Sequence, residues 1–244
     1  MLEVQNLAKH FGSIEAVRGI SFKVEKGQVL GVLGPNGAGK TTTMRMITGF
    51  LPPSSGTAVV NGHDVTKDPV AAKNEIGYLP ENAPVYDSMT VTLFLRFAGK
   101  MRGYRGEALN RRVEEIIERC HLQRVRNQSI HTLSKGYRQR TCFAQAIFHD
   151  PPILVMDEPT DGLDPNQKFV VRNMIRDMAK DKVIIVSTHI LEEVDAVCNR
   201  AIIIARGRIV ANGTPDELKA MSDTGRLDDV FRKLTIEDEE RAAA

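Results

Sequence analysis

The sequence contains no tryptophan, few aromatic residues, only three cysteines and no long apolar run. Cys120, Cys142 and Cys198 lie far apart and lack the paired spacing of zinc or redox motifs, so neither a metal cluster nor a disulfide scaffold is expected. The longest apolar runs, at 153–156 and 201–205, have the length of strands and fall short of the roughly 20 residues that span a bilayer. These absences predict a soluble chain in a reducing cytoplasm.

An excess of charge of one sign is also missing. The chain has 33 lysines and arginines against 31 aspartates and glutamates, which gives a net charge of +2. Because nucleic-acid-binding proteins usually carry a basic excess or stripe, no nucleic-acid partner is expected. The first residues, MLEVQNLAKHFG, are polar where a signal peptide would be apolar, so no secretion signal is expected.

What the sequence does contain is a regular alternation of short β-branched runs and amphipathic segments of helical length. This alternation predicts an α/β fold with a mostly parallel sheet. Buried parallel strands are almost continuously apolar. Four runs fit this description: residues 29–33, 153–156, 183–187 and 201–205.

Two other regions differ from these buried strands. Residues 20–27 and 57–65 alternate in polarity and end in turn residues, which predicts a small antiparallel sheet. Residues from about 84 to 150 carry mainly helical patterns, of which EALNRRVEEIIERC at 107–120 is the clearest. We therefore expect a helical subdomain inserted between two core strands.

The C-terminal segment, residues 221–244, is predicted to form a helix followed by a frayed tail. Leu227, Val230, Phe231 and Leu234 follow helical spacing and give the helix one apolar face. We expect this face to pack on the chain's own domain, and docking to a partner is the alternative.

A glycine-rich segment, GPNGAGKT at 34–41, matches the phosphate-loop pattern G-x-x-x-x-G-K-[ST] between an apolar strand and a helix-like stretch. Gly37 and Gly39 permit backbone angles that turn N–H groups inward around phosphate oxygens. Lys40 would supply charge to the β- and γ-phosphates at the start of a helix, whose positive end attracts the same anion. The motif predicts binding of a nucleoside triphosphate. The expected contacts are Gly34, Pro35, Asn36, Gly37, Ala38, Gly39, Lys40, Thr41 and Thr42, with the Thr41 hydroxyl as a Mg²⁺ ligand.

Two adjacent carboxylates follow a second apolar strand in ILVMDEPTDGLDP at 153–165. Asp157 lies at the predicted strand end, where it would hold Mg²⁺ as a Walker B aspartate does. Glu158 would point to the other side and accept a proton from an attacking water. Two solvated carboxylates at a strand end are the alternative, but beside a phosphate loop the pair indicates hydrolysis.

The order of GPNGAGKTT, LSKGYRQR at 133–140, ILVMDEPTDGLD and STH at 187–189 resembles the ATP-binding cassette (ABC) ATPases across residues 1 to about 220. The family signature is commonly LSGGQ. This chain keeps Leu133, Ser134 and Gly136 but has Lys135 and Tyr137, a form found in some export subunits. The resemblance implies that Ser134 and the N–H groups of Lys135 and Gly136 bind the γ-phosphate of ATP held by a second subunit, so that a homodimer closes around two ATP molecules.

The resemblance also implies roles for single residues. Phe11 matches the aromatic that stacks on adenine, although a plain core aromatic is the alternative. His189 matches the histidine that contacts the γ-phosphate and the attacking water, and Asp164 matches an aspartate that contacts the partner subunit. Glu81 stands where the family usually has a glutamine that ligates Mg²⁺ and senses the membrane partner.

Residues 83–104, APVYDSMTVTLFLRFAGKMRGY, resemble a pattern of ABC exporters for drugs, polysaccharides and gliding motility. They would line the groove that receives a helix of an integral membrane permease. The sequence LDDVFRKLT near the C-terminus resembles the same class. We therefore expect an ATP-hydrolysing exporter subunit on the cytoplasmic face of a membrane. A soluble ABC ATPase without a membrane partner is the alternative, and a kinase or GTPase is disfavoured because both lack the Ser134–Gly136 signature.

Overall fold

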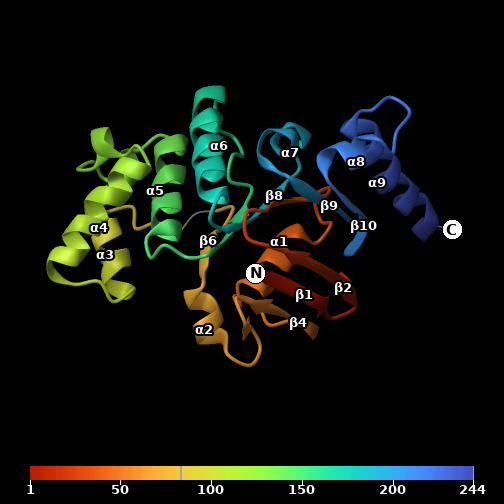
Figure 1. Cartoon of the computed structure of the whole chain (residues 1–244), viewed down its shortest axis with the longest axis horizontal. Helices are drawn as coiled ribbons and strands as arrows, with labels where there is room; N and C mark the ends of the chain where they lie inside the picture. Colours follow the sequence, from red (N-terminus) through yellow and green to blue (C-terminus); the bar gives the residue numbers. More distant parts are fainter. Residues whose placement is uncertain (83, 244) are drawn as a thin grey trace.

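The computed structural model describes residues 1–82 and 84–243, and the surroundings of side chains as far as residue 235. Within these residues the strands form a six-stranded, mostly parallel sheet and a four-stranded antiparallel sheet, with helices around them (Figure 1). The predicted α/β fold is therefore confirmed.

The larger sheet has the strand order β10-β9-β3-β8-β7-β6. All of its neighbours are parallel except the hairpin of β9 and β10. Its central strands are buried along their whole length because helices or the second sheet cover both faces. All four predicted core strands are confirmed. The bounds are β3 Val29–Leu33, β6 Ile76–Leu79, β7 Ile153–Asp157, β8 Val183–Thr188, β9 Arg200–Ala205 and β10 Arg208–Gly213.

The predicted antiparallel sheet is present, in the order β2-β1-β4-β5. Helix α1 (Lys40–Ile47) lies between the two sheets, where Met44, Met46 and Ile47 are buried in a core that both sheets share. The N-terminal end of this helix is thereby held beside the carboxyl ends of the parallel strands. The strands are β1 Leu2–Phe11, β2 Ile14–Val24, β4 Ser55–Val60 and β5 His63–Asp64.

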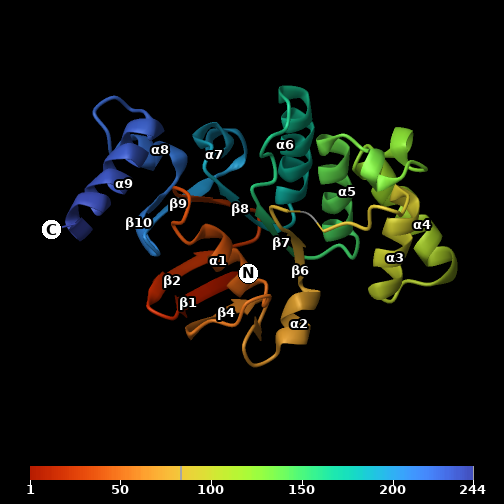
Figure 2. The same ribbon diagram turned by 180° about the vertical axis from the view of Figure 1, so that it is seen from behind.

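The helical subdomain lies at one end of the molecule (Figures 1 and 2). Its chain leaves the core after β6 and returns at β7, and these two strands are parallel neighbours. The predicted insertion between two core strands is therefore confirmed. Its helices share one apolar core with α6 and a face of the large sheet. The elements are α3 Val91–Met101, α4 Gly106–Arg119, α5 Lys135–Ile147 and the short 3₁₀ turns Gln123–Val125 and Ile130–Thr132.

The C-terminal helix, α9 (Leu227–Ala243), packs on the chain's own domain, as expected. Leu227 and Val230 are buried in a cluster with Leu33 and Ile203 of the large sheet. The predicted frayed end falls on residues 236–244, whose side chains lie outside the described residues. The remaining helices are α2 Pro69–Asn74, α6 Pro165–Ala179, α7 Leu191–Val197 and α8 Pro215–Lys219.

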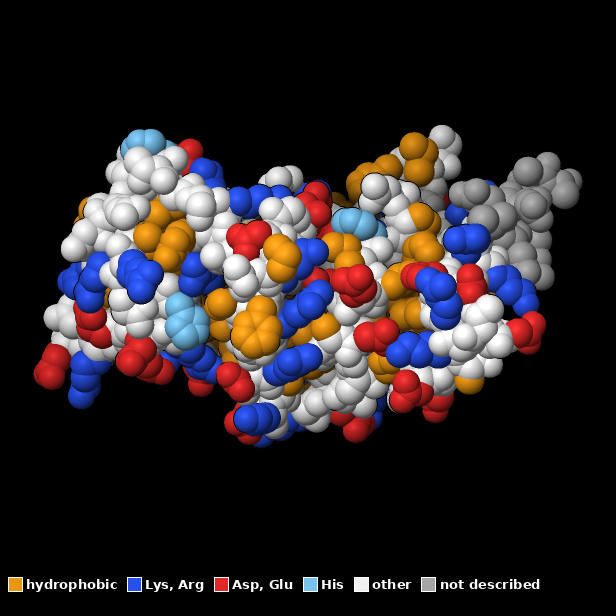
Figure 3. Space-filling model, turned by 90° about the horizontal axis from the view of Figure 1, so that it is seen from above, with side chains coloured by type: hydrophobic (Ala, Val, Ile, Leu, Met, Phe, Trp, Pro, Cys, Tyr) orange, Lys and Arg blue, Asp and Glu red, His pale blue; other side chains and the backbone are white. Residues whose placement is uncertain are grey.

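Charged side chains of both signs are intermixed on the face shown in Figure 3, as the near-zero net charge predicts. In the described part of the chain, no helix has both the length and the apolar character needed to cross a bilayer.

Candidate active site

The glycine-rich loop joins β3 to α1 and follows the path that its glycines allow. Gly37 and Gly39 have φ angles of 80° and 104°, a region that side chains other than glycine rarely adopt. A Cβ atom on Gly39 would lie 2.5 Å from the carbonyl oxygen of Ala16 on β2. The loop can therefore approach the antiparallel sheet only because this residue is glycine.

The loop forms the floor of a cavity of about 460 Å³. Most of the predicted nucleotide contacts lie together in its wall, and they are joined there by Glu81, Glu158 and His189 from three other segments. The lining residues are Ala16, Pro35, Asn36, Gly37, Ala38, Gly39, Lys40, Thr41, Thr42, Glu81, Glu158, Asp161 and His189.

Lys40 is the buried cation of this cavity, with 6% of its surface exposed. Its Nζ donates hydrogen bonds to the carbonyl oxygens of Gly34 (2.8 Å) and Pro35 (3.2 Å). It also lies 3.7 Å from Oε1 of Glu158. The ammonium group is thus held between the loop carbonyls and the carboxylate of Glu158.

Glu158 follows β7 with a φ angle of 52°, in the left-handed region. Its backbone N–H donates to both the hydroxyl (3.1 Å) and the carbonyl (3.2 Å) oxygen of Ser187, which holds this uncommon conformation. Its Oε2 lies 2.8 Å from Nδ1 of His189. Burial raises the pKa of the Glu158 carboxyl, although His189 and Lys40 oppose the shift. The geometry suits a group that accepts a proton.

Asp157 is fully buried at the end of β7. The Ser187 hydroxyl donates to its Oδ1, whereas Oδ2 is buried and has no hydrogen-bond partner among the described residues. Since buried polar atoms are normally satisfied, an unpartnered carboxylate oxygen beside a phosphate loop fits a hard cation such as Mg²⁺. The described residues contain no cluster of three or more His, Cys, Asp or Glu side chains for a metal. A partial donor set suits Mg²⁺, which keeps waters and phosphate oxygens as ligands.

The signature residues lie outside the cavity. Ser134 caps α5 by accepting a hydrogen bond from the Tyr137 N–H (3.5 Å), so the predicted helix start is confirmed. Lys135 Nζ lies 3.5 Å from Oδ2 of Asp161. Gly136 is buried against the side chain of Gln167 on α6. No contact joins these residues to the phosphate loop in the described part of this single chain.

Two more predicted site residues do not line the cavity. Phe11 is 47% exposed at the end of β1, and Lys9 Nζ lies 5.3 Å from the centroid of its ring. Asp164 caps α6, because its Oδ1 accepts hydrogen bonds from the N–H groups of Asn166 (2.9 Å) and Gln167 (3.0 Å).

Three residues of the site were not selected from the sequence. Asp161 lies three residues after Glu158 in the same loop. Its position close to the two predicted acids could have suggested that it belongs to the site. Ser187 begins the STH triplet and bonds both Asp157 and Glu158, a role that its place before His189 could have suggested. Ala16 reaches the cavity from β2. Nothing in the sequence around Ala16 indicates this, because it depends on how the two sheets pack.

Comparison with known proteins agrees with this geometry. Residues 17–161 match the family model described as ABC transporter. The chain is 37% identical over 223 residues to the probable multidrug ABC transporter ATP-binding protein YbhF of Escherichia coli, covering 91% of this chain but 38% of YbhF. It is 37% identical over 225 residues to the ABC transporter ATP-binding protein NatA of Bacillus subtilis, with 91% and 92% of the two chains covered.

Similarity extends to an export protein and to a solved structure. The Nod factor export ATP-binding protein I of Ralstonia nicotianae is 36% identical over 219 residues, covering 89% of this chain and 68% of that one. A solved ATP-binding subunit of an ABC transporter superposes with a TM-score of 0.86 at 29% identity, over 96% of this chain and 99% of that chain. This chain therefore belongs to the ABC transporter family, among whose ATP-binding proteins these relatives are named.

Proposed function

We propose that this chain drives export across a membrane by binding and hydrolysing ATP as a dimer attached to a separate permease. The observation that carries the proposal is the placement of Glu158, held by His189 and facing Lys40 across the phosphate-loop cavity. This arrangement brings a cation for phosphate and a base for water into one site. Residues 1–220 would be the ATPase domain, and residues 221–244 a C-terminal extension.

ATP binding would rearrange the contacts of Lys40. Its ammonium group now bonds two loop carbonyls, which are weaker partners than phosphate oxygens that carry a full negative charge. The N–H groups of residues 36–42 would surround the β- and γ-phosphates, and Phe11 would stack on adenine. Glu158 would then accept a proton from the attacking water, while His189 orients both the base and the γ-phosphate.

Thr41, Asp157 and Glu81 would hold Mg²⁺. The ion would neutralise charge on the phosphate oxygens, and the unpartnered Oδ2 of Asp157 supports this assignment. Glu81 is exposed and lines the same cavity. Because it is a carboxylate where the family usually has a glutamine, it would add a negative charge beside the phosphates.

The exposed N-terminal end of α5 supports a dimer. Ser134 and Lys135 lie on the surface and make no contact with their own phosphate loop, whereas a helix N-terminus favours an anion. They would, with Gly136, bind the γ-phosphate held by a second copy, and Asp164 would contact that copy. Two chains would thus enclose two ATP molecules.

Size-exclusion chromatography tests the dimer. Glu158→Gln should bind ATP without hydrolysing it and elute as a dimer in ATP, but as a monomer without it. Adding Ser134→Arg to this variant should return it to a monomer in ATP while leaving ATP binding unchanged in titration calorimetry. A dimer that persists in the double variant would contradict the assignment of the signature residues.

Export and a membrane permease are supported by similarity. The Nod factor relative is named for export, and residues 83–104 resemble the export class. The chain would sit on the cytoplasmic face of the membrane. Purification of the tagged chain from detergent-solubilised membranes of its own source should retain a polytopic membrane protein at near-equal stoichiometry. An active ATPase that retains only soluble proteins would favour a soluble ABC ATPase instead.

A further inference from the structure

A lysine stands over the exposed aromatic ring at the end of β1. The Nζ atom of Lys9 lies 5.3 Å from the centroid of the Phe11 ring. A cation within about 6 Å of an aromatic centroid is attracted by the negative face of the ring. One face of Phe11 is therefore in contact with a positive charge of the chain itself.

The hairpin of β1 and β2 brings Phe11 close to the phosphate-loop cavity. Phe11 pairs with Ile14, and Ala16, which lines the cavity, follows two residues later on β2. Two residues of a strand span roughly 7 Å. Phe11 thus stands beside the cavity wall, and because it is 47% exposed it still has surface to offer to a ligand.

Lys9 is held in place by the segment that follows α1. Its Nζ donates a hydrogen bond to the carbonyl oxygen of Pro52 (2.7 Å), which lies between α1 and β4. Helix α1 begins at Lys40 of the phosphate loop. Lys9 therefore connects the Phe11 ring to the part of the chain that carries the phosphate loop.

The backbone at this place is fixed without the Lys9 side chain. The N–H of His10 donates to the Ser54 hydroxyl (3.0 Å), and the N–H of Ser54 donates to the carbonyl oxygen of Ala8 (2.8 Å). The pairing of β1 with β2 adds further bonds. Removal of the ammonium group should therefore change the surroundings of the ring and leave the fold intact.

The charge of Lys9 is not neutralised by an acid. Over residues 1–82 and 84–235, no carboxylate lies within ion-pair distance of its Nζ. The Pro52 carbonyl orients the ammonium group but carries no net charge. The full positive charge thus acts on the face of the Phe11 ring.

Resting on the proposed function, in which Phe11 stacks on adenine, we propose that Lys9 is a positioning residue for the nucleobase. Lys9 holds the Phe11 ring from one face, and adenine stacks on the other. An exposed phenylalanine side chain that has to be fixed when the base binds loses rotamer freedom, which weakens binding. A ring that Lys9 already holds avoids this loss.

Titration calorimetry of the full chain with ADP and with pyrophosphate tests the role of Lys9. Lys9→Met keeps the apolar stem of the side chain and removes its charge. This variant should raise the dissociation constant of ADP by about 2- to 5-fold, the size of one exposed cation–π contact. The dissociation constant of pyrophosphate, which has no base, should not change. In ATP hydrolysis, KM should rise by the same factor while kcat stays constant.

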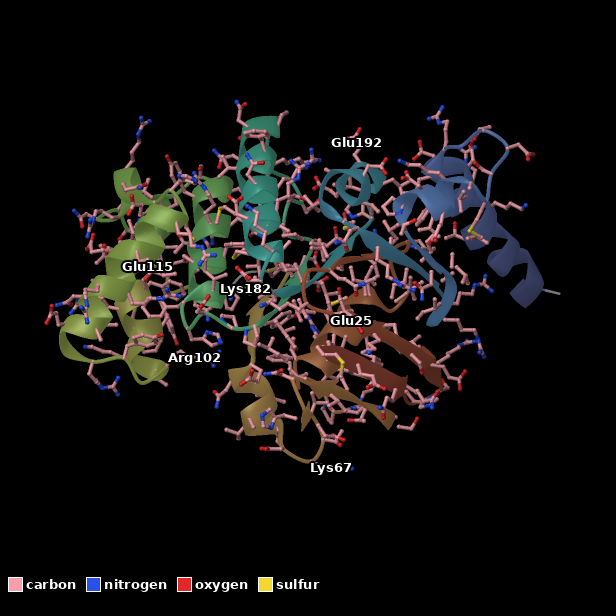
Figure 4. All side chains as sticks on the ribbon, viewed as in Figure 1. Glu25, Lys67, Arg102, Glu115, Lys182 and Glu192 are labelled. Carbon is pink, nitrogen blue, oxygen red and sulfur yellow. The ribbon has the colours of Figure 1, made fainter. Side chains whose placement is uncertain are left out.

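Two further lysine variants complete the test. Lys9→Arg retains a cation over the ring and should bind ADP as the wild type does. Lys67→Met is the matched control, because this exposed lysine follows β5 at the opposite edge of the same antiparallel sheet (Figure 4) and pairs with Asp64. It should change neither dissociation constant.

A double-mutant cycle shows whether Lys9 acts through Phe11. Phe11→Leu removes the ring, so adding Lys9→Met to this variant should cause no further loss of ADP affinity. Four results would overturn the role of Lys9: an unchanged ADP affinity in Lys9→Met, an equal loss of ADP and pyrophosphate affinity, a loss that Lys9→Arg does not restore, or the same loss with and without the ring.

The Phe11→Leu variant alone separates this inference from the proposed function. If Phe11→Leu binds ADP more weakly than the wild type but Lys9→Met does not, the inference about Lys9 fails and the stacking of adenine on Phe11 stands. If Phe11→Leu binds ADP as the wild type does, the proposed stacking fails, and the inference fails with it.

Discussion

The phosphate cavity has a volume of about 460 Å³, and the larger part of a second hollow, which we call the docking groove, has a volume of about 620 Å³. The docking groove runs between the C-terminal end of α1, strand β6 and helix α3, and its smaller part, of about 420 Å³, shares wall residues with the larger. Residues of the segment 83–104, which is expected to receive a permease helix, form part of its wall. Phe50 and Met101 in this wall are each 72% exposed.

The two sites differ in whether their charged side chains have partners. In the cavity, Lys40 bonds loop carbonyls and lies near Glu158, which in turn contacts His189. In the groove, Arg45, Lys73 and Arg102 have no carboxylate partner within the described part of the chain. A site whose charges are already oriented suits a small ligand and catalysis. A site with unpaired charge and exposed apolar groups suits a macromolecular partner.

The two sites also differ in how they arise along the chain. Most of the cavity wall is one continuous segment, residues 35–42, whose conformation follows from its glycines and the helix behind it. The groove combines residues of α1, α2, β6, α3 and α5. The cavity could be expected from one stretch of sequence, whereas of the groove only residues 83–104 were expected and the contributions of α1, α2, β6 and α5 were not.

The largest expected effect is on catalysis. Glu158→Gln should lower kcat by about 10²- to 10⁴-fold, because a positioned base contributes a factor of this size, while ATP binding persists. Glu192→Gln is a matched control: this carboxylate is exposed on the adjacent helix α7 and does not line the cavity. Steady-state hydrolysis of ATP measures both. A Glu158→Gln rate near that of the wild type would show that another group accepts the proton.

The second largest effect is on nucleotide affinity, and it compares one cation from each site. Lys40→Ala should weaken ATP binding by roughly 100-fold, because the phosphates lose a buried cation. Lys73→Ala removes a cation from the docking groove and should leave ATP affinity unchanged. Titration calorimetry measures the two dissociation constants. Equal losses in both variants would mean that the two sites are not independent.

A smaller effect is expected in the pH dependence of hydrolysis. Burial raises the pKa of Glu158 above 4.5, so its base form, and with it kcat, should be lost as pH falls through that raised value. His189 lowers this pKa. The residual activity of His189→Ala should therefore have its acidic limb at higher pH than the wild type, whereas that of His131→Ala, an exposed histidine outside the cavity, should not shift. If the acidic limb of the pH profile does not move in His189→Ala, protonation of Glu158 does not determine the pH at which activity is lost.

The smallest effect concerns stability. Phe50 in the groove is 72% exposed, so Phe50→Ser should change the free energy of unfolding by no more than about 0.5 kcal/mol. Ile47 lies one turn earlier and is fully buried, so Ile47→Ala should lower the free energy of unfolding by about 2–5 kcal/mol. Urea denaturation compares the two. A large loss in Phe50→Ser would mean that the groove wall is part of the core, which would weaken its assignment to a partner.

Much of the fold could be predicted because the patterns that mark its strands and helices each lie within a short stretch of the sequence. The four core strands are continuous apolar runs, and residues 107–120 repeat with helical spacing, so each could be read without knowledge of its neighbours. The insertion of the helical subdomain followed from the order of these patterns. The pairing order of the sheet could not be read, because the sequence does not state which parallel strands become neighbours.

The active site was predictable to the same extent. The phosphate loop, Asp157 and Glu158 were predicted from distinctive patterns next to strand ends, whereas His189 was assigned only from the resemblance to the ABC ATPases. Ala16, Asp161 and Ser187 were not identified. The first depends on the packing of the antiparallel sheet against the loop, and the other two on hydrogen bonds and cavity shape that join separate segments.

The sequence alone predicted a phosphate loop followed by two adjacent acids, and the order of its motifs resembled the ABC ATPases, because each of these patterns lies within a few neighbouring residues. Only the tertiary structure decided that Glu158 contacts His189 and faces Lys40, that Asp157 keeps one oxygen unpartnered, and that Arg102 lies in an apolar groove without a carboxylate partner among the described residues. Burial and electrostatic compensation depend on every segment that packs nearby, so they exist only once the chain has folded.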